Sequence, residues 1–276
     1  MGLREEALKI HKQKRGKLEV VSKIEVKNNK DLSLAYTPGV AEPCKEIAKD
    51  KSKVYDYTMK GNTVAVVSDG SAVLGLGDIG PEASLPVMEG KALLFKEFAN
   101  IDAIPICLDT KDVDEIVKTV KLMQPTLGGV NLEDISAPRC FEIEKRLKEE
   151  LDIPVFHDDQ HGTGIVVLAG IINALKLVNK KLEDTKIIIN GGGAAGTSIA
   201  KLILKAGAKN VIVGDLKGAI SRDDSNTFVG SHHEELSKIT NPNLEKGSLK
   251  EIMKGADILI GVSKGNLVDT EMVKSM

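Results

Sequence analysis

The stretch KIIINGGGAAG, residues 186–196, decides the fold of the second half of the chain. Its first five residues form a β-branched apolar run, which is typical of a buried strand. The motif G-x-G-x-x-G follows at once over residues 191–196. Its glycines are Gly191, Gly193 and Gly196, and Ala194 and Ala195 stand between the last two. Glycines at this spacing permit a tight turn, a close approach of the backbone to a pyrophosphate and close packing of helix on strand.

The residues after this loop complete a dinucleotide-binding unit. A helix is expected to about residue 206, and a strand over 210–214 ends just before Asp215. An acidic residue at this distance from the glycines is placed to hydrogen-bond the ribose hydroxyls of a dinucleotide. Asp215 favours NAD over NADP because it repels a 2′-phosphate, and the nearby Lys217 softens that preference. The sequence therefore predicts a Rossmann-like domain that binds NAD, with NADP as the alternative.

Two pairs of acidic residues follow neighbouring strands in the first half of the chain. Glu133 and Asp134 follow a strand over 129–132, and Asp158 and Asp159 follow a strand over 153–156. The helix expected between them makes a strand–helix–strand unit, whose two strands run parallel and end on the same edge of the sheet. The acidic pairs are therefore expected to converge at that edge.

Converging carboxylates have two interpretations. Their charged forms repel unless a cation compensates, and oxygen ligands point to a hard ion such as Mg²⁺ or Mn²⁺. Taken singly, Asp134, Asp158 or Asp159 would equally serve as a helix cap. The two histidines beside the second pair, His157 and His161, have no ligand spacing, although either would suit a place behind a metal ligand.

Lys91 lies in a helix expected over residues 85–99. It shares a face with three large apolar residues, Val87, Leu94 and Phe98. Burial lowers the pKa of a lysine, which suits it to act as a general base. The alternative is a lysine at the edge of the stripe whose ammonium group reaches water.

Strands that alternate with helices along the whole chain predict an α/β protein with largely parallel sheets. With 276 residues, of which 42 % are apolar, the chain is long enough for two domains, divided as 1–160 and 161–276. A net charge of −2 gives no basic surface for nucleic acid or an anionic membrane, and no apolar run is long enough to span a bilayer. Three cysteines far apart in the sequence fit reduced thiols in a cytoplasmic protein. The histidines at 232 and 233 fall in a polar stretch and are expected at the surface.

Long stretches of the chain resemble the malic enzymes, particularly their short bacterial and archaeal type. The matching stretches are AYTPGVAEPC (35–44), SDGSAVLGLGDIGPEASLPVMEGKALLFK (68–96), GVNLEDISAPRCFEIE (129–144), IPVFHDDQHGTGIVVLAG (153–170) and NGGGAAG (190–196). The resemblance implies a homodimer that oxidises malate with NAD(P)⁺ and decarboxylates the product to pyruvate. It implies Glu133, Asp134 and Asp159 as ligands of a divalent metal, Lys91 as the general base and Tyr36 as the general acid.

The sequence departs from the family pattern at two places. Ala72 stands where long-type members carry an arginine for the substrate carboxylate. The chain also stops at Met276, before a further strand that the family has, so the dinucleotide-binding domain is expected to be incomplete. Two other readings therefore stay open at this point: a metal-independent enzyme of the amino-acid dehydrogenase type, and an inactive fragment that binds NAD.

Overall fold

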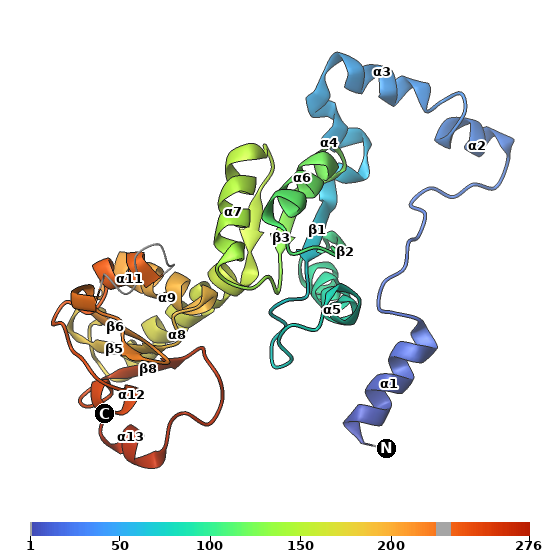
Figure 1. Ribbon diagram of the computed structural model, residues 1–276. Coiled ribbons are helices and arrows are strands. Elements are labelled where there is room, and N and C mark those ends of the chain that lie inside the picture. Colours follow the sequence, from blue (N-terminus) through green and yellow to red (C-terminus); the bar gives the residue numbers. More distant parts are fainter. Residues whose placement is uncertain (1, 225–232) are drawn as a thin grey trace. The chain divides into compact units, whose positions relative to one another are not determined.

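The computed structural model describes residues 2–224 and 233–276 of the chain (Figure 1). They form two compact units. The first comprises Met1–Ile135 and Ile143–Phe156, and the second comprises Ser136–Glu142 and His157–Met276. Both are built on four-stranded sheets, as expected for an α/β protein.

The first sheet has the strand order β2-β1-β3-β4, with β1 parallel to both β2 and β3. Its strands are β1 (Thr63–Ser68), β2 (Asp102–Cys107), β3 (Gly129–Leu132) and β4 (Val155–His157). The helices along this part of the chain are α1 (Leu3–Lys14), α2 (Asn29–Ala35), α3 (Ala41–Lys49), α4 (Val54–Tyr57), α5 (Pro81–Ala99), α6 (Val113–Met123) and α7 (Arg139–Glu150). Three 3₁₀ turns accompany them: η1 (Lys51–Lys53), η2 (Met59–Asn62) and η3 (Gln124–Thr126).

The core of the first unit forms where α5 and α6 bury one face each. Met88 and Ala92 of α5 and Ile116 of α6 are completely buried, as are Ala65 and Val66 of β1. Met88 and Ala92 are four residues apart and so lie on one side of α5, the helix that contacts β1 and β2. By contrast, α1, α2 and α3 contain no buried residue.

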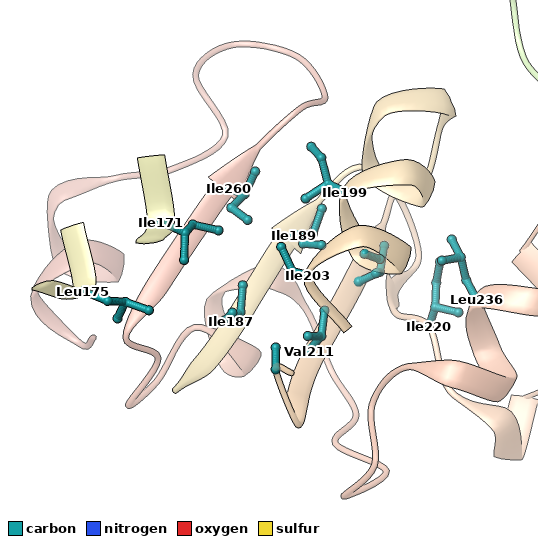
Figure 2. Close-up of a cluster of buried hydrophobic side chains, with 13 residues drawn as sticks. Ile171, Leu175, Ile187, Ile189, Ile199, Ile203, Val211, Ile220, Leu236 and Ile260 are labelled. Carbon is teal, nitrogen blue, oxygen red and sulfur yellow. The ribbon is translucent and has the colours of Figure 1, made fainter. Parts of the chain in front are cut away.

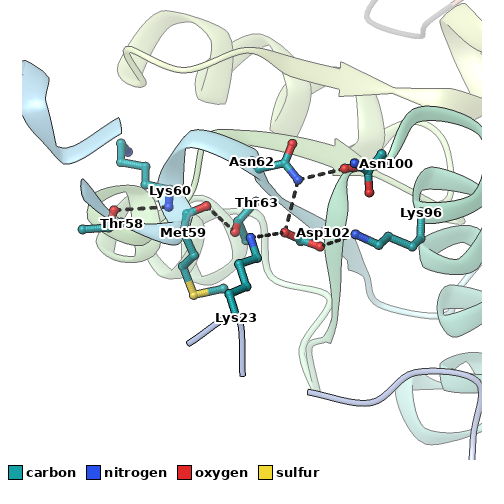
Figure 3. Close-up of polar contacts among 9 residues, drawn as sticks. All are labelled: Lys23, Thr58, Met59, Lys60, Asn62, Thr63, Lys96, Asn100 and Asp102. Carbon is teal, nitrogen blue, oxygen red and sulfur yellow. Dashed lines mark hydrogen bonds and ion pairs between the residues drawn. The ribbon is translucent and has the colours of Figure 1, made fainter. Parts of the chain in front are cut away.

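Asp102, the first residue of β2, joins three separate segments (Figure 3). Its carboxylate accepts hydrogen bonds from Lys96 of α5 at 2.9 Å and from Asn62 at 3.1 Å, and it lies 3.3 Å from the ammonium of Lys23. The hydrogen bond from Lys96, followed by that from Asn62, lowers the pKa of Asp102 to about 2. This cluster fixes the start of β2 to the end of α5.

The second sheet has the order β7-β6-β5-β8, with β5 parallel to β6 and β8 and a short antiparallel β7 at one edge. Its strands are β5 (Lys186–Asn190), β6 (Asn210–Asp215), β7 (Gly218–Ala219) and β8 (Ile258–Gly261). The helical elements are η4 (Asp158–Gly162), α8 (Thr163–Leu177), η5 (Leu182–Asp184), α9 (Ala194–Lys205), η6 (Arg222–Asp224), α11 (His233–Ile239), α12 (Leu249–Ile252) and α13 (Thr270–Lys274). The element η4 is a π-helical turn.

Alternation along β5 gives the second sheet two apolar faces. Ile187 and Ile189 point toward Ile171 of α8 and Ile199 of α9, in the cluster that Figure 2 shows. Ile188, between them, points to the opposite face, where it packs with Ile252 and Met253. A strand buried on both faces is expected to be apolar at every position, which is why KIIIN shows no alternation of apolar and polar residues.

Candidate active site

Glu133 and Asp134 lie directly after β3, where the backbone leaves the first sheet. Both are buried, with 8 % and 4 % of their surface exposed. The amide of Asn131 donates a 2.8 Å hydrogen bond to Oε2 of Glu133. Asp134 has φ 54°, and its carbonyl oxygen accepts a hydrogen bond from the N–H of Ala72 at 2.9 Å. The strand end and the loop after β1 thus hold both acidic residues in place.

Asp158 and Asp159, which follow β4, point to different neighbours. A Cβ at Gly162 would lie 2.3 Å from Oδ1 of Asp158, so this carboxylate folds back over its own π-helical turn. Asp159 instead offers one oxygen to a group with Glu133 and Asp134, and the three oxygens lie within 4.8 Å of one another. The adjacent charges therefore have separate surroundings, and Asp159 is the one that joins the acidic group.

The three grouped carboxylates suit a hard divalent cation. All their donor atoms are oxygens, which Mg²⁺ and Mn²⁺ prefer. Two of the three residues are buried, and like charges held this close without water are costly unless a cation offsets them. The ammonium of Lys91 lies 3.2 Å from Oε2 of Glu133 and supplies one positive charge. The three oxygen donors, held within 4.8 Å of one another, therefore fit a metal ion.

Lys91 is placed by α5, but not in the way that its apolar neighbours suggested. The stripe of Val87, Leu94 and Phe98 is solvent-exposed, and the buried face of α5 is formed by smaller residues, Ser84, Met88 and Ala92. Of the two readings that the stripe left open, burial of the lysine against it does not hold, and a lysine that reaches water fits better. The side chain is 21 % exposed, and an acidic partner rather than an apolar wall defines its surroundings.

Tyr36 follows α2 and is 67 % exposed. Neither α2 nor the next helix, α3, buries a residue. The structure therefore gives the Tyr36 hydroxyl no packed environment, and its role as a general acid stays a prediction.

The glycine-rich loop runs from the end of β5 into α9. Gly191 has φ +127°, a conformation that L side chains rarely adopt. A Cβ at Gly196 would lie 1.7 Å from the carbonyl oxygen of Gly191, so only glycine lets the first turn of α9 pack on the loop. No atom lies within 4 Å of a Cβ built at Gly193, and Ala194 and Ala195 open the helix. The loop thus leaves space at the N-terminus of α9, where phosphate groups bind.

Asp215 ends β6, the strand next to this loop. Its Oδ1 accepts a 2.7 Å hydrogen bond from the N–H of Lys217, and its Oδ2 lies 3.5 Å from Nδ1 of His233. The other ring nitrogen of His233 donates to the carbonyl oxygen of Gly192 at 3.1 Å. His233 thus contacts both the glycine-rich loop and the acidic residue that the sequence assigned to the ribose.

The expectation that His233 is a surface residue was wrong, because only 16 % of its side chain is exposed. The signal that sequence reasoning missed is Leu236, three residues later. Leu236 is fully buried and anchors α11 to the core, which brings His233 inward. The neighbouring histidine at 232 lies outside the described residues.

Comparisons with known proteins agree with these features. A family model described as "Malic enzyme, N-terminal domain" matches residues 15–148, and one described as "Malic enzyme, NAD binding domain" matches residues 160–276. Together they cover most of the chain.

Curated relatives and solved structures point the same way. The chain is 60 % identical over its whole length to a bifunctional malic/malolactic enzyme of Bacillus subtilis and 61 % identical over 95 % of its length to an NAD-dependent malic enzyme of Geobacillus stearothermophilus. It spans 67 % and 54 % of the lengths of these relatives. The crystal structure of an NAD-dependent malic enzyme from Thermotoga maritima is 52 % identical and matches with a TM-score of 0.94, over 98 % of this chain and 72 % of that one. The chain therefore belongs to the malic enzyme family.

Proposed function

We propose that the protein oxidatively decarboxylates malate to pyruvate and CO₂ while reducing NAD(P)⁺, and that it requires Mg²⁺ or Mn²⁺. Relatives named NAD-dependent and NADP-dependent malic enzymes support the reaction class. The observation that carries the proposal is the group of three carboxylate oxygens within 4.8 Å, with the Lys91 ammonium 3.2 Å from one member, Glu133.

The acidic group would hold the metal through Glu133, Asp134 and Asp159. A divalent cation bound there would polarise the C2 oxygen of malate as a Lewis acid and stabilise the enolate charge that develops as CO₂ leaves. Asn131 donates a hydrogen bond to the carboxylate of Glu133, and Ala72 donates one to the backbone carbonyl of Asp134, which holds the segment that carries both residues. Preformed ligands bind a metal with less reorganisation, which supports this assignment.

Two side chains of the protein would move protons. Lys91, as the neutral amine, would accept the C2 hydroxyl proton as hydride leaves C2 for the nicotinamide, and Tyr36 would donate a proton to C3 of enolpyruvate. The ion pair of Lys91 with Glu133 keeps the ammonium nitrogen beside the acidic group, where the substrate hydroxyl would bind. A general base must come within hydrogen-bond reach of its proton, and this placement satisfies that requirement.

The second unit would bind the dinucleotide through the glycine-rich loop. Gly191, Gly193 and Gly196 admit the pyrophosphate, Ala194 and Ala195 begin the helix beneath it, and Asp215 receives the ribose hydroxyls. The carboxylate of Asp215 supports NAD as the preferred cofactor, since it would repel the 2′-phosphate of NADP.

The exposed apolar residues of the first 60 residues support a homodimer. Leu3, Leu8, Val20, Val21 and Leu34 are each more than 60 % exposed. Apolar surface of this kind on consecutive elements marks an interface between proteins. A cytoplasmic location is proposed from the three free cysteines. None of the described helices is long and apolar enough to cross a membrane.

The direct test is NADH absorbance with malate, with and without Mn²⁺, on the purified chain and on a chain extended past Met276. Malate-dependent NADH formation that chelation abolishes and Mn²⁺ restores is the expected result. Turnover that survives chelation would favour the metal-independent dehydrogenase reading. Binding of NAD, measured by calorimetry, without any turnover would favour the inactive fragment.

A further inference from the structure

His157, the last residue of β4, is a buried imidazole that the proposed mechanism does not use. Its side chain is completely buried. Nδ1 lies 2.7 Å from the amide nitrogen of Gln160, and Nε2 lies 3.0 Å from Oδ2 of Asp159. Nε2 has no well-aligned hydrogen bond to any described atom. The ring therefore presents Nε2 to the carboxylate of Asp159, one of the three grouped acidic residues.

The amide of Gln160 decides which ring nitrogen carries the proton. An amide nitrogen can only donate, so Nδ1 of His157 must accept, and in the neutral ring the proton is then on Nε2. Nε2 points to Asp159, whose Oδ2 is a hydrogen-bond acceptor. Gln160 is itself buried, with 6 % of its surface exposed, so this chain of donors is shielded from water.

We infer that His157 is a positioning residue that holds the carboxylate of Asp159 for metal binding, with Gln160 fixing its tautomer. An N–H on Nε2, 3.0 Å from Oδ2, would attract the carboxylate electrostatically and restrain its rotation, even without the alignment of a full hydrogen bond. Partners behind a metal ligand commonly change metal affinity 10–100-fold. The inference rests on the proposed metal site, but the dinucleotide site plays no part in it.

The test is the affinity of the purified chain for Mn²⁺ alone, measured by electron paramagnetic resonance of the free ion. His157→Leu removes the donor and should weaken Mn²⁺ binding about 10–100-fold. His157→Gln can place an amide N–H near the position of Nε2 and should restore affinity to within about threefold. Gln160→Met removes the amide that fixes the tautomer of His157. Its loss of Mn²⁺ affinity should fall between those of the two His157 variants.

Two controls separate this role from a general effect on folding. His11→Leu alters a histidine of α1 that belongs to no candidate site and should leave Mn²⁺ affinity unchanged. NAD affinity, measured by calorimetry, should be the same in every variant, because the glycine-rich loop is untouched. If His157→Leu fails to fold, His157→Gln and Gln160→Met decide the question through the same two measurements.

The outcomes distinguish the inference from the function on which it rests. An unaltered chain that binds no Mn²⁺ overturns the metal site itself. If the unaltered chain binds Mn²⁺ and His157→Leu binds it equally well, the positioning role is wrong. It is also wrong if folded His157→Leu and His157→Gln lose the same affinity, since the shape of the side chain and not its donor would then matter.

Discussion

At the scale of single residues, charge placement matters more than hydrophobic patterning in the candidate site. Lys91 was singled out because of an apolar stripe that proves to be exposed. The lysine is nevertheless beside the acidic group, because α5 directs it to Glu133 at 3.2 Å. Its value as a base therefore depends on that local electrostatic setting.

Replacing Lys91 by alanine should reduce kcat by about 10²–10⁴-fold, the range that general acid–base catalysis supplies. NAD affinity should stay within about twofold, because the dinucleotide loop belongs to another part of the chain. Steady-state kinetics and calorimetry measure the two effects. Lys96→Ala, which removes a lysine from the same helix, is the matched control and should keep kcat. Activity of Lys91→Ala within a fewfold of the unaltered chain would rule out the base assignment.

Asp215 should control the choice between the two nicotinamide dinucleotides. Asp215→Asn removes the negative charge and keeps the shape, so NADP affinity should rise relative to NAD by about tenfold, the equivalent of about 1.4 kcal/mol. Competition binding with both cofactors checks the ratio. An unchanged ratio in a folded variant would show that Asp215 does not face the 2′ position.

At the scale of elements, the contact between the glycine-rich loop and α9 has no space for a side chain. Gly196→Ala would place a Cβ 1.7 Å from the Gly191 carbonyl oxygen, so we expect a loss of stability of about 1–3 kcal/mol and a loss of NAD binding. Gly193→Ala is the control, since its Cβ meets no protein atom within 4 Å. It should keep the thermal unfolding temperature and weaken only NAD binding. Equal unfolding temperatures for the two variants would contradict this account.

The junction of β2 and α5 should make stability depend on pH. The pKa of Asp102 is lowered from 3.8 to about 2, so its contribution is complete above 3.8 and disappears as the pH falls through about 2. Asp102→Asn should lower the free energy of unfolding by about 1 kcal/mol at pH 7, the scale of a partly exposed ion pair. The difference from the unaltered chain should shrink between pH 4 and pH 2 in urea titrations. A difference that is the same at pH 7 and at pH 2 would contradict this account.

The regular elements could be read from the sequence because local patterns determine them. The strands over residues 129–132 and 186–190 were predicted with the bounds that the structure has. The glycine spacing likewise gave the loop between β5 and α9. What the sequence did not give were contacts between distant segments. Neither the exposure of the stripe on α5 nor the inward position of His233 follows from a local pattern, since both depend on what other elements cover.

At the scale of the whole molecule, α1 to α3 lack the buried residues that normally stabilise helices. Short helices without packing are marginal in water, and a partner that covered their apolar residues would stabilise them. A second copy of the chain is the partner that we propose.

Light scattering should give twice the chain mass of 29.6 kDa at micromolar concentrations. Leu34→Lys should shift the equilibrium toward the single chain, because a charge replaces an apolar side chain that is 68 % exposed on α2. Leu177→Lys, at an 88 % exposed leucine at the end of α8, is the control and should not. A single-chain mass for the unaltered protein at all concentrations would exclude the dimer.

The π-helical turn over Asp158–Gly162 makes the direction of the Asp159 side chain depend on the number of residues in this segment. Such a turn contains one residue more than an α-helical turn would need. Deleting a single residue would let α8 continue as a regular helix, and each residue removed from a helix rotates what precedes it by about 100°. Asp159 would then face another direction, even where the sequence still contained all three carboxylates of the acidic group. A substitution at His161, within this turn, should thus be tolerated more readily than the deletion of that residue.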